Sequence, residues 1–343
     1  MREASSIAHI ATESNGSAFE SHDPAFGEVL GDAPRLVRVV AADAHEGPVY
    51  VAGEDALYFT TLPQRGEASA PRVAIKRLAL DGDRFPLEEE RVSVVVPDAN
   101  AANGMALDLQ GRLVICEQGT LAEHARIGRL DLATRSLETV VDAWSGLRFN
   151  SPNDVVVKSD GTVWFTDPSY GHLQGFKPEP QVGDHVYRYD PGAGRLSVVA
   201  DSFDKPNGLA FWPDESVLYI TDSGANQEEG SFHVGRPHHV MAFDVIGSRH
   251  LAGARLFAVT TPGFPDGIKV DADGRVYVSA ASGVQVFSPE GDLIGEIHLP
   301  GVVNFAFGGP GRNVLFITKD TDIWAAVLGA TAPEPAASER KGA

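Results

Sequence analysis

Phe149 to Gly171 reads FNSPNDVVVKSDGTVWFTDPSYG, and it contains the pattern from which the architecture can be predicted. Two runs rich in β-branched and aromatic residues flank Ser159-Asp160-Gly161, which is typical of a β-hairpin. The first run is preceded by Asn153 and Asp154, and turn propensity alone would explain such residues at a strand boundary. If the same polar residue before a hairpin recurs along the chain, turn propensity alone no longer explains it.

The arrangement occurs six times along the chain. Each unit has an oxygen-bearing residue, a short apolar strand, a tight turn and a second strand. The centre of the second strand follows the oxygen-bearing residue by 11 positions in three units and by 12 in the others, a difference that one extra turn residue explains. We call these six oxygen-bearing residues the anchor residues; they are Glu46, Asn103, Asn153, Asn207, Asp266 and Asn304.

Third and fourth strand-like segments follow most hairpins, and they predict an all-β fold, a six-bladed β-propeller with four-stranded blades. The last unit is one strand short, whereas an unassigned strand spans Arg35 to Ala41 near the start of the chain. We expect this N-terminal strand to complete the last blade and close the ring. The expected organisation is a flexible segment over 1–22, one propeller domain over 23–328 and a disordered tail over 329–343.

The anchor residues are expected to meet in the central channel, because the first strand of each propeller blade lines it. Turn propensity predicts Asn, Asp, Gly or Ser at such positions, but it does not predict Glu46 or an oxygen-bearing side chain in every unit. Buried carboxylates and amides without partners cost several kcal/mol each. A cation bound among the anchor residues would remove that cost.

Calcium suits this set of ligands, because it binds mixed carboxylate and amide oxygens. Mg²⁺ is the second choice, and Mn²⁺ and Zn²⁺ stay open, although the absence of Cys and His among the anchor residues makes zinc a poor match. The segment from Asp271 to Gly274 is not an EF-hand, because the first and last ligand positions would fall on Lys269 and Ala280. A purely structural ion in the channel is the alternative to a catalytic one.

Composition excludes several classes of partner. The chain has 28 Lys and Arg against 47 Asp and Glu, a net charge of -19, which argues against nucleic acid and anionic membranes. The first thirty residues lack the apolar segment of a signal peptide, so a cytoplasmic location is the default expectation. Cys116 is the only cysteine, and its place in an apolar strand predicts a buried, inert thiol. Nucleophile-elbow, zincin and Walker motifs are absent from the sequence.

The segments SPNDVVVKSDGTVWFTDPSYG, KPNGLAFWPDESVLYITDSG and FPDGIKVDADGRVYVSA resemble the senescence-marker-protein/gluconolactonase (SGL) family. DPAFGEVLGDAPRLVRVV and HVYRYDP are similar to its lactonohydrolase branch in particular. The resemblance covers about Asp23 to Leu328. It implies a six-bladed propeller with a catalytic divalent ion, usually calcium, in the channel.

The resemblance also implies roles for individual residues. The family's glutamate ligand matches Glu46 in HEGP, its asparagine ligands match Asn153 in SPND and Asn207 in KPNG, and its aspartate matches Asp266 in FPDG. Asn103 in ANGM matches a channel position that faces substrate or a metal-bound water. The last blade often departs from the ligand pattern, so the sixth anchor residue is assigned no ligand role.

These features predict a calcium-dependent hydrolase that opens the ester of a small lactone, with metal polarisation of the carbonyl and attack by water. Asp266 is the expected general base, and the fallback is His172, expected on the loop above the channel, or another loop residue. Asn103, Tyr170 and His172 are expected to contact the substrate. Two alternatives stay open: a phosphotriesterase-like organophosphate hydrolase, since the family includes such enzymes, and a non-enzymatic propeller that binds a ligand. The oligomeric state is not predicted.

Overall fold

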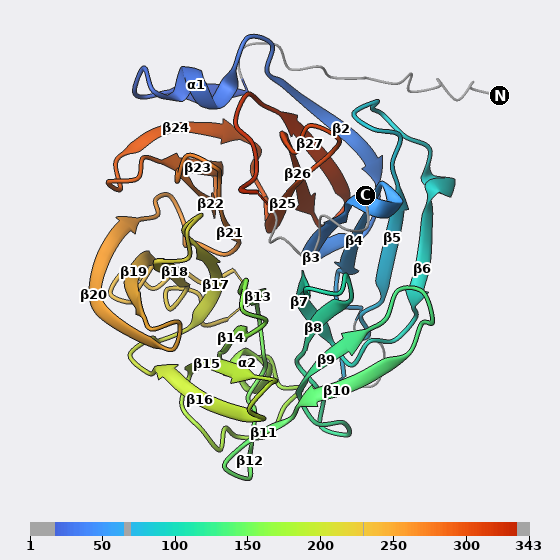
Figure 1. The fold of residues 1–343 in the computed structure, drawn as a ribbon, viewed down its shortest axis with the longest axis vertical. Helices are drawn as coiled ribbons and strands as arrows, with labels where there is room; N and C mark the ends of the chain where they lie inside the picture. Colours follow the sequence, from blue (N-terminus) through green and yellow to red (C-terminus); the bar gives the residue numbers. More distant parts are fainter. Residues whose placement is uncertain (1–17, 65–69, 229, 335–343) are drawn as a thin grey trace, which may run out of the picture.

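The computed structural model describes residues 18–64, 70–228 and 230–334. Six antiparallel sheets surround a central channel as the blades of a propeller, which confirms the predicted fold (Figure 1). Within the described ranges, no helix is both long enough and apolar enough to cross a membrane.

Each blade is a meander whose strands follow one another from the channel outward. The innermost strands are β3 (Ala44–Val51), β7 (Ala102–Leu107), β13 (Val155–Val157), β17 (Pro206–Phe211), β21 (Ile268–Val270) and β25 (Asn304–Gly308). The second strands are β4 (Ala56–Thr61), β8 (Leu113–Glu117), β14 (Val163–Asp167), β18 (Val217–Asp222), β22 (Val276–Ala280) and β26 (Val314–Lys319). The third strands are β5 (Ile75–Ala79), β9 (Arg126–Leu130), β15 (His185–Asp190), β19 (His239–Ile246), β23 (Gly283–Phe287) and β27 (Asp322–Val327).

The outer strands complete the blades, and the remaining elements are short. The fourth strands are β6 (Val92–Val96), β10 (Leu137–Val141), β16 (Arg195–Ala200), β20 (His250–Val259), β24 (Leu293–His298) and β2 (Arg35–Ala41). The other elements are β1 (Phe19–Ser21), α1 (Phe26–Leu30), η1 (Ala52–Glu54), η2 (Glu89–Arg91), the hairpin of β11 (Ala143–Trp144) and β12 (Leu147–Arg148), and α2 (Tyr170–Leu173).

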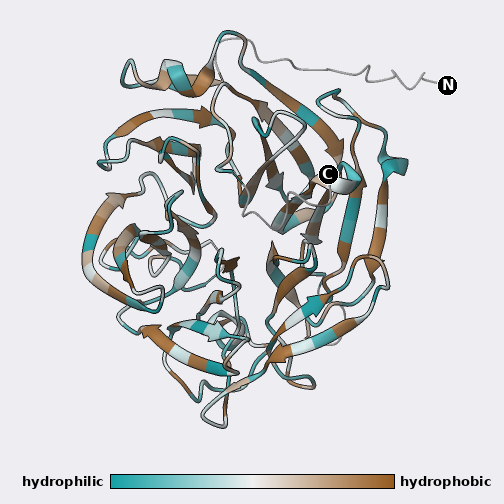
Figure 2. Cartoon of the chain, viewed as in Figure 1, coloured by the Kyte–Doolittle hydropathy of each residue, from teal (hydrophilic) through white to brown (hydrophobic). Residues whose placement is uncertain are grey.

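The hydrophobic core lies between neighbouring blades rather than at the centre of the ring. Strands β8, β14 and β22 are buried at every position, because adjacent blades cover both of their faces. The fourth strands β10 and β20 are exposed at most positions. In Figure 2 the outermost strands accordingly alternate between hydrophobic and hydrophilic colours. The inner strands of each blade are therefore fixed by hydrophobic packing on both faces of the sheet.

The predicted closure of the ring is present. Strand β2 pairs antiparallel with β27, from Arg35 opposite Val327 to Ala41 opposite Asp322, and so supplies the fourth strand of the last blade. Leu36, Val39 and Val40 of β2 are buried in the clusters on either side of this blade. Residues from both ends of the chain therefore form one sheet.

Ordered structure continues beyond residues 23–328, the range predicted for the propeller, at both ends. Strand β1 pairs with β24 and makes the fifth blade five-stranded, so part of the segment over 1–22 is ordered. Phe26 of α1 is fully buried above Gly295, where a Cβ would lie 2.3 Å from its ring. Past residue 328, the amide of Ala330 donates to the carbonyl of Val29 at 3.1 Å. At the N-terminal end the reason is the outer edge of β24, whose unpaired backbone groups bind strand β1. Residues 1–17 and 335–343 lie outside the described structure.

Candidate metal and substrate site

The innermost strands contact one another in cyclic order, β3, β7, β13, β17, β21 and β25, and then β3 again. Every anchor residue lies within two residues of the first residue of its innermost strand. Because all six strands run in the same direction along the channel, the anchor residues form a ring at one end of it. We call this end the channel mouth.

Glycines allow the anchor residues of neighbouring blades to approach closely. Four anchor residues are followed by glycine, at which any side chain would collide with the next blade. The nearest atoms to a Cβ built there are Asn103 O for Gly47 (2.5 Å), Asp154 Oδ1 for Gly104 (2.5 Å), Asp266 O for Gly208 (2.4 Å) and Asn304 Oδ1 for Gly267 (2.4 Å). The anchor-glycine dipeptide therefore sets the spacing between blades at the mouth.

Hydroxyl groups on the second strands also join neighbouring blades at this level. In four blades a threonine donates to the backbone carbonyl of an anchor residue, or of the residue before it, in the next blade. The pairs are Thr60 with Asn103 (3.1 Å), Thr166 with Asn207 (2.7 Å), Thr221 with Asp266 (3.1 Å) and Thr318 with His45 (2.6 Å). In the second blade Cys116 takes this position; it is fully buried as predicted, and burial raises the pKa of its thiol well above the usual value.

Three carboxyl groups share the channel mouth. Glu46 accepts hydrogen bonds at Oε2 from Asn304 Nδ2 (2.7 Å) and from the amide of Gly47 (3.2 Å). Burial raises the pKa of Glu46. The pKa of Asp266 is raised well above its usual value by burial, and then by the negative charges of Glu46 and Asp154, while a hydrogen bond with Asn207 opposes this. These carboxyl groups therefore destabilise one another's charged forms when no cation is present.

Sequence reasoning missed Asp154. Its Oδ1 accepts a hydrogen bond from the amide of Val155 (2.9 Å), whereas its buried Oδ2 has no partner in the described part of the chain. Burial raises its pKa, and Lys269 opposes this effect. A signal was present in the sequence, because Asp154 replaces the glycine that follows the anchor residue in four other units. It occupies the space that Gly104 leaves open in the neighbouring blade.

The amide anchor residues differ in their contacts. Asn103 is buried, and its Oδ1 has no hydrogen-bond partner among the described residues. The amide of Asn153 donates to Thr166 O (2.9 Å), and its carbonyl accepts from the amide of Gly104 (2.7 Å), which fixes its place in the ring. Asp266 thus interacts with Asn207 through a hydrogen bond and with Glu46 through its charge. Asn153 is placed in the ring by its backbone hydrogen bonds.

Buried aspartates at the ends of second strands hold the segments that lead to two anchor residues. Asp167 accepts hydrogen bonds from the amides of Asn150 (3.0 Å) and Ser151 (2.8 Å), just before Asn153. Asp222 does the same for Lys205 (2.9 Å), just before Asn207. Burial raises the pKa of Asp167 to about 8. Thr166-Asp167 and Thr221-Asp222 end the second strands of their blades. The contacts of the two aspartates position the backbone, which explains why the Thr-Asp pair is repeated and assigns it no catalytic role.

Tyr170 lies at the mouth, whereas His172 faces outward. The hydroxyl of Tyr170 donates to Ser223 O (3.3 Å), and Ser223 Oγ donates to the carbonyl of Pro265, next to Asp266. Burial, and then the charge of Asp266, raises the pKa of Tyr170 well above its usual value. His172 is exposed on α2, and no described contact joins it to an anchor residue.

The ligand chemistry fits a hard divalent cation. The unpartnered buried oxygens of Asn103 and Asp154 lie in the same ring as the carboxyl groups of Glu46 and Asp266. Within 18–64, 70–228 and 230–334, no group of three or more His, Cys, Asp and Glu side chains is arranged to hold a metal, so amide oxygens are needed to complete a shell. Carboxylates with neutral amides are the ligands that calcium prefers, and zinc is disfavoured.

Comparison with known proteins agrees with this arrangement. The chain is 30% identical to a gluconolactonase of Zymomonas mobilis over 323 residues, covering 87% of this chain and 85% of the relative. It is 30% identical to a lactonohydrolase of Aspergillus oryzae over 310 residues, covering 84% and 69%. A solved gluconolactonase structure from Xanthomonas campestris superposes with a TM-score of 0.74 and 32% identity, covering 94% of this chain and 98% of that one. Residues 44–321 match the model of the SMP-30/gluconolactonase/LRE-like region (SGL), and the chain belongs to this family.

Proposed function

We propose that the chain is a divalent-cation-dependent lactonase that hydrolyses the ester of a small lactone. The observation that carries the proposal is the ring of anchor residues, in which carboxyl groups of Glu46 and Asp266 share one channel mouth with amide oxygens. The relatives described as a gluconolactonase and a lactonohydrolase support a lactone as the substrate class.

Glu46, Asn153, Asn207 and Asp266 would hold the ion, and Ca²⁺ is the cation that suits them best. Bound there, the cation would polarise the lactone carbonyl and stabilise the negative charge that develops on its oxygen. Two carboxylates match the charge of a divalent ion, and the amides contribute oxygen without adding charge. The Asn304 amide holds Glu46 in position from the neighbouring blade.

The chain's own residues would orient the substrate and move the proton. Asp266 is less buried than Glu46 as a whole residue, and its carboxylate would accept a proton from the attacking water. The free Oδ1 of Asn103 can accept a hydrogen bond from a substrate hydroxyl. Tyr170 borders the same space through its position beside Asp266. No covalent intermediate is required.

Hydrolysis of a panel of neutral lactones, measured with and without EDTA, tests the proposal. We expect activity that EDTA abolishes and that added Ca²⁺ restores, because none of the anchor residues carries a positive charge that could stabilise an oxyanion and Lys269 is opposed by the Asp154 carboxylate. A phosphotriester measured in parallel separates the organophosphate-hydrolase alternative. Lactone hydrolysis that is unaffected by complete removal of metal would contradict the proposal, as would turnover of the phosphotriester alone.

A further inference from the structure

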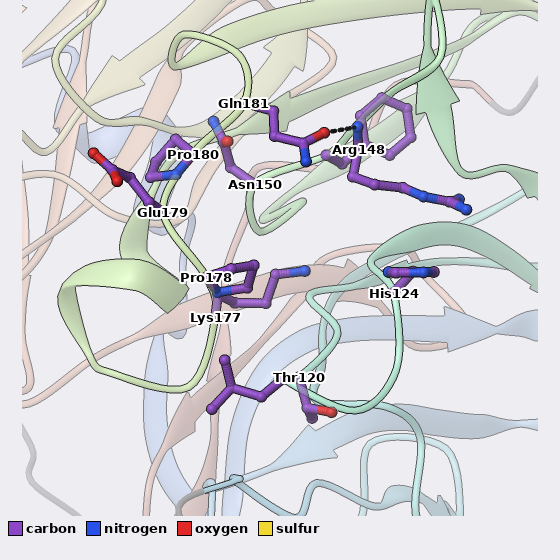
Figure 3. A pocket seen from close by; sticks show the side chains of 11 residues that line it. Thr120, His124, Arg148, Asn150, Lys177, Pro178, Glu179, Pro180 and Gln181 are labelled. Carbon is purple, nitrogen blue, oxygen red and sulfur yellow. Dashed lines mark hydrogen bonds between the residues drawn. The ribbon is translucent and has the colours of Figure 1, made fainter.

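A pocket of about 110 Å³ lies beside the channel mouth, between loops of the second and third blades (Figure 3). Its walls are formed by residues 120–124 after β8, residues 148–150 before β13 and residues 177–181 after α2. All three segments are at the end of the blades where the anchor residues lie. Apart from the backbone amide of Asn150, which Asp167 holds, the site described above uses none of the residues in these walls.

Lys177 distinguishes this pocket from an ordinary surface hollow. The residue is 8% exposed, and no described carboxylate oxygen lies within 4.0 Å of its ammonium nitrogen. The other two buried lysines of the described structure are paired, Lys158 with Glu215 (2.6 Å) and Lys205 with Asp184 (2.7 Å). The rest of the residue is buried, while the ammonium group meets the pocket and has no carboxylate in contact with it, so an anion bound in the pocket would be stabilised by an unpaired positive charge.

The backbone holds Lys177 in place. Its amide donates to Gly171 O (3.0 Å), and its aliphatic stem covers Gly171, where a Cβ would lie 2.3 Å from Lys177 Cγ. The amide of Gly171 in turn donates to Ser151 Oγ (2.8 Å), two residues before Asn153. The ammonium group is therefore presented by a segment that is fixed to the channel mouth.

Lys177 is the one unpaired cation among the residues that line the pocket in the described structure. Figure 3 shows its amine directed across the pocket toward His124, with Arg148 on the same side and the Glu179 carboxylate turned away. Arg148 is paired with Asp142 at 2.5 Å, so Lys177 is the cation that still lacks a partner. Burial lowers the pKa of Lys177 to about 8, which Asp167 opposes, so the side chain remains mostly protonated at neutral pH. In a chain of net charge -19, this local positive site is selective for anions at short range.

The pocket is close enough to the anchor residues to hold part of the same substrate. Asn150 lines the pocket and Asn153 is an anchor residue, and three residues of extended chain span at most about 11 Å. We propose that this pocket binds an anionic substituent of the lactone substrate, a carboxylate or a phosphate, through Lys177 while the ester lies at the channel mouth. The inference rests on the proposed lactonase function and specifies its substrate class.

Kinetics on matched lactones test the proposal. The substrates are neutral D-glucono-1,5-lactone, its 6-phosphate and D-glucaro-1,4-lactone, which carries a carboxylate. Lys177→Met keeps the apolar stem but removes the charge, and we expect it to lower kcat/KM about 10-fold to 100-fold for the anionic lactones, the range for a charge-assisted hydrogen bond. The neutral lactone should change less than about twofold, since no charge is involved. Equal losses on all three substrates, or no loss on the anionic two, would overturn the proposal.

Lys319→Gln is the matched control. Lys319 ends β26 in the blade opposite the pocket, at the same end of the propeller, so this variant removes an equal charge from the same face. It should leave the preference between anionic and neutral lactones unchanged. A loss of preference equal to that of Lys177→Met would assign the effect to net charge and contradict a specific subsite.

Direct binding separates this inference from the lactonase proposal. Calorimetric titration of 6-phosphogluconate and of glucarate, without divalent cations, requires no turnover. We expect binding by the wild-type chain, at least tenfold weaker binding by Lys177→Met, and weaker wild-type binding at pH 9 than at pH 7, since the ammonium form is lost through about pH 8. Binding that depends on Lys177 in a chain without lactonase activity would refute the proposed function and retain the subsite. Equal binding by both proteins, or none by either, would refute the subsite.

Discussion

Asp266→Asn is expected to lower kcat for lactone opening by about 10²-fold to 10⁴-fold even when the metal site is saturated, the range for loss of a general base. The substitution keeps the size and one carbonyl oxygen of the side chain but removes its charge and basicity. Asp266 is only partly buried, unlike Glu46, so it can contact both an ion and a water molecule at the channel mouth. If Asp266 were only a ligand, saturating calcium would restore most of the rate.

Glu46→Gln is the control for this substitution. It removes the same charge from the metal site, but Glu46 is 4% exposed and held by Asn304, so it has no access to the attacking water. Its activity should recover with added calcium. The measurement is kcat for both variants across a calcium titration, with occupancy determined separately by metal analysis. Equal recovery would exclude Asp266 as the base and direct attention to the loops over the mouth, beginning with His172.

The fold and the ring of anchor residues could be predicted because both follow from local repeats. Each unit encodes its own hairpin, and the position of Asn153 or Asp266 relative to that hairpin places it at the channel without knowledge of any other blade. Closure could also be predicted, since the last unit lacks a strand that Arg35–Ala41 supplies. These features depend on the spacing of the repeats and on the number of strands in each unit, and both can be read from a single sequence.

Other features could not be predicted because they depend on contacts between units. Asp154 departs from the glycine of four other units, but its place at the mouth depends on the space that Gly104 leaves in the preceding blade, and that contact cannot be read from the repeat. Strand β1 forms only because β24, more than 270 residues later, presents an open edge. Lys177 could be recognised only after the structure showed a buried lysine with no described carboxylate oxygen within 4.0 Å of its ammonium nitrogen. Such relations require the packed structure.

Deletion through Ala41 is expected to abolish cooperative folding, whereas deletion through Asp32 should only lower the melting temperature. The shorter deletion removes β1 and α1, with two large buried side chains, Phe26 and Val29, and leaves the ring closed. The longer one also removes β2 and three more, Leu36, Val39 and Val40, and leaves the outer edge of β27 unpaired.

The magnitudes separate the two outcomes. A fully buried aliphatic or aromatic side chain contributes about 1.5–3 kcal/mol, so the shorter deletion removes about 3–6 kcal/mol and the longer one about 8–15 kcal/mol. The second range lies within the net stability of a typical protein, about 5–15 kcal/mol, before the lost β-ladder of the last blade is considered. Calorimetric melting and near-ultraviolet circular dichroism of both variants provide the measurement. A single sharp transition near the wild-type temperature in the longer deletion would show that β2 does not close the ring energetically. Loss of the transition in the shorter one would instead make β1 and α1 part of the folding unit.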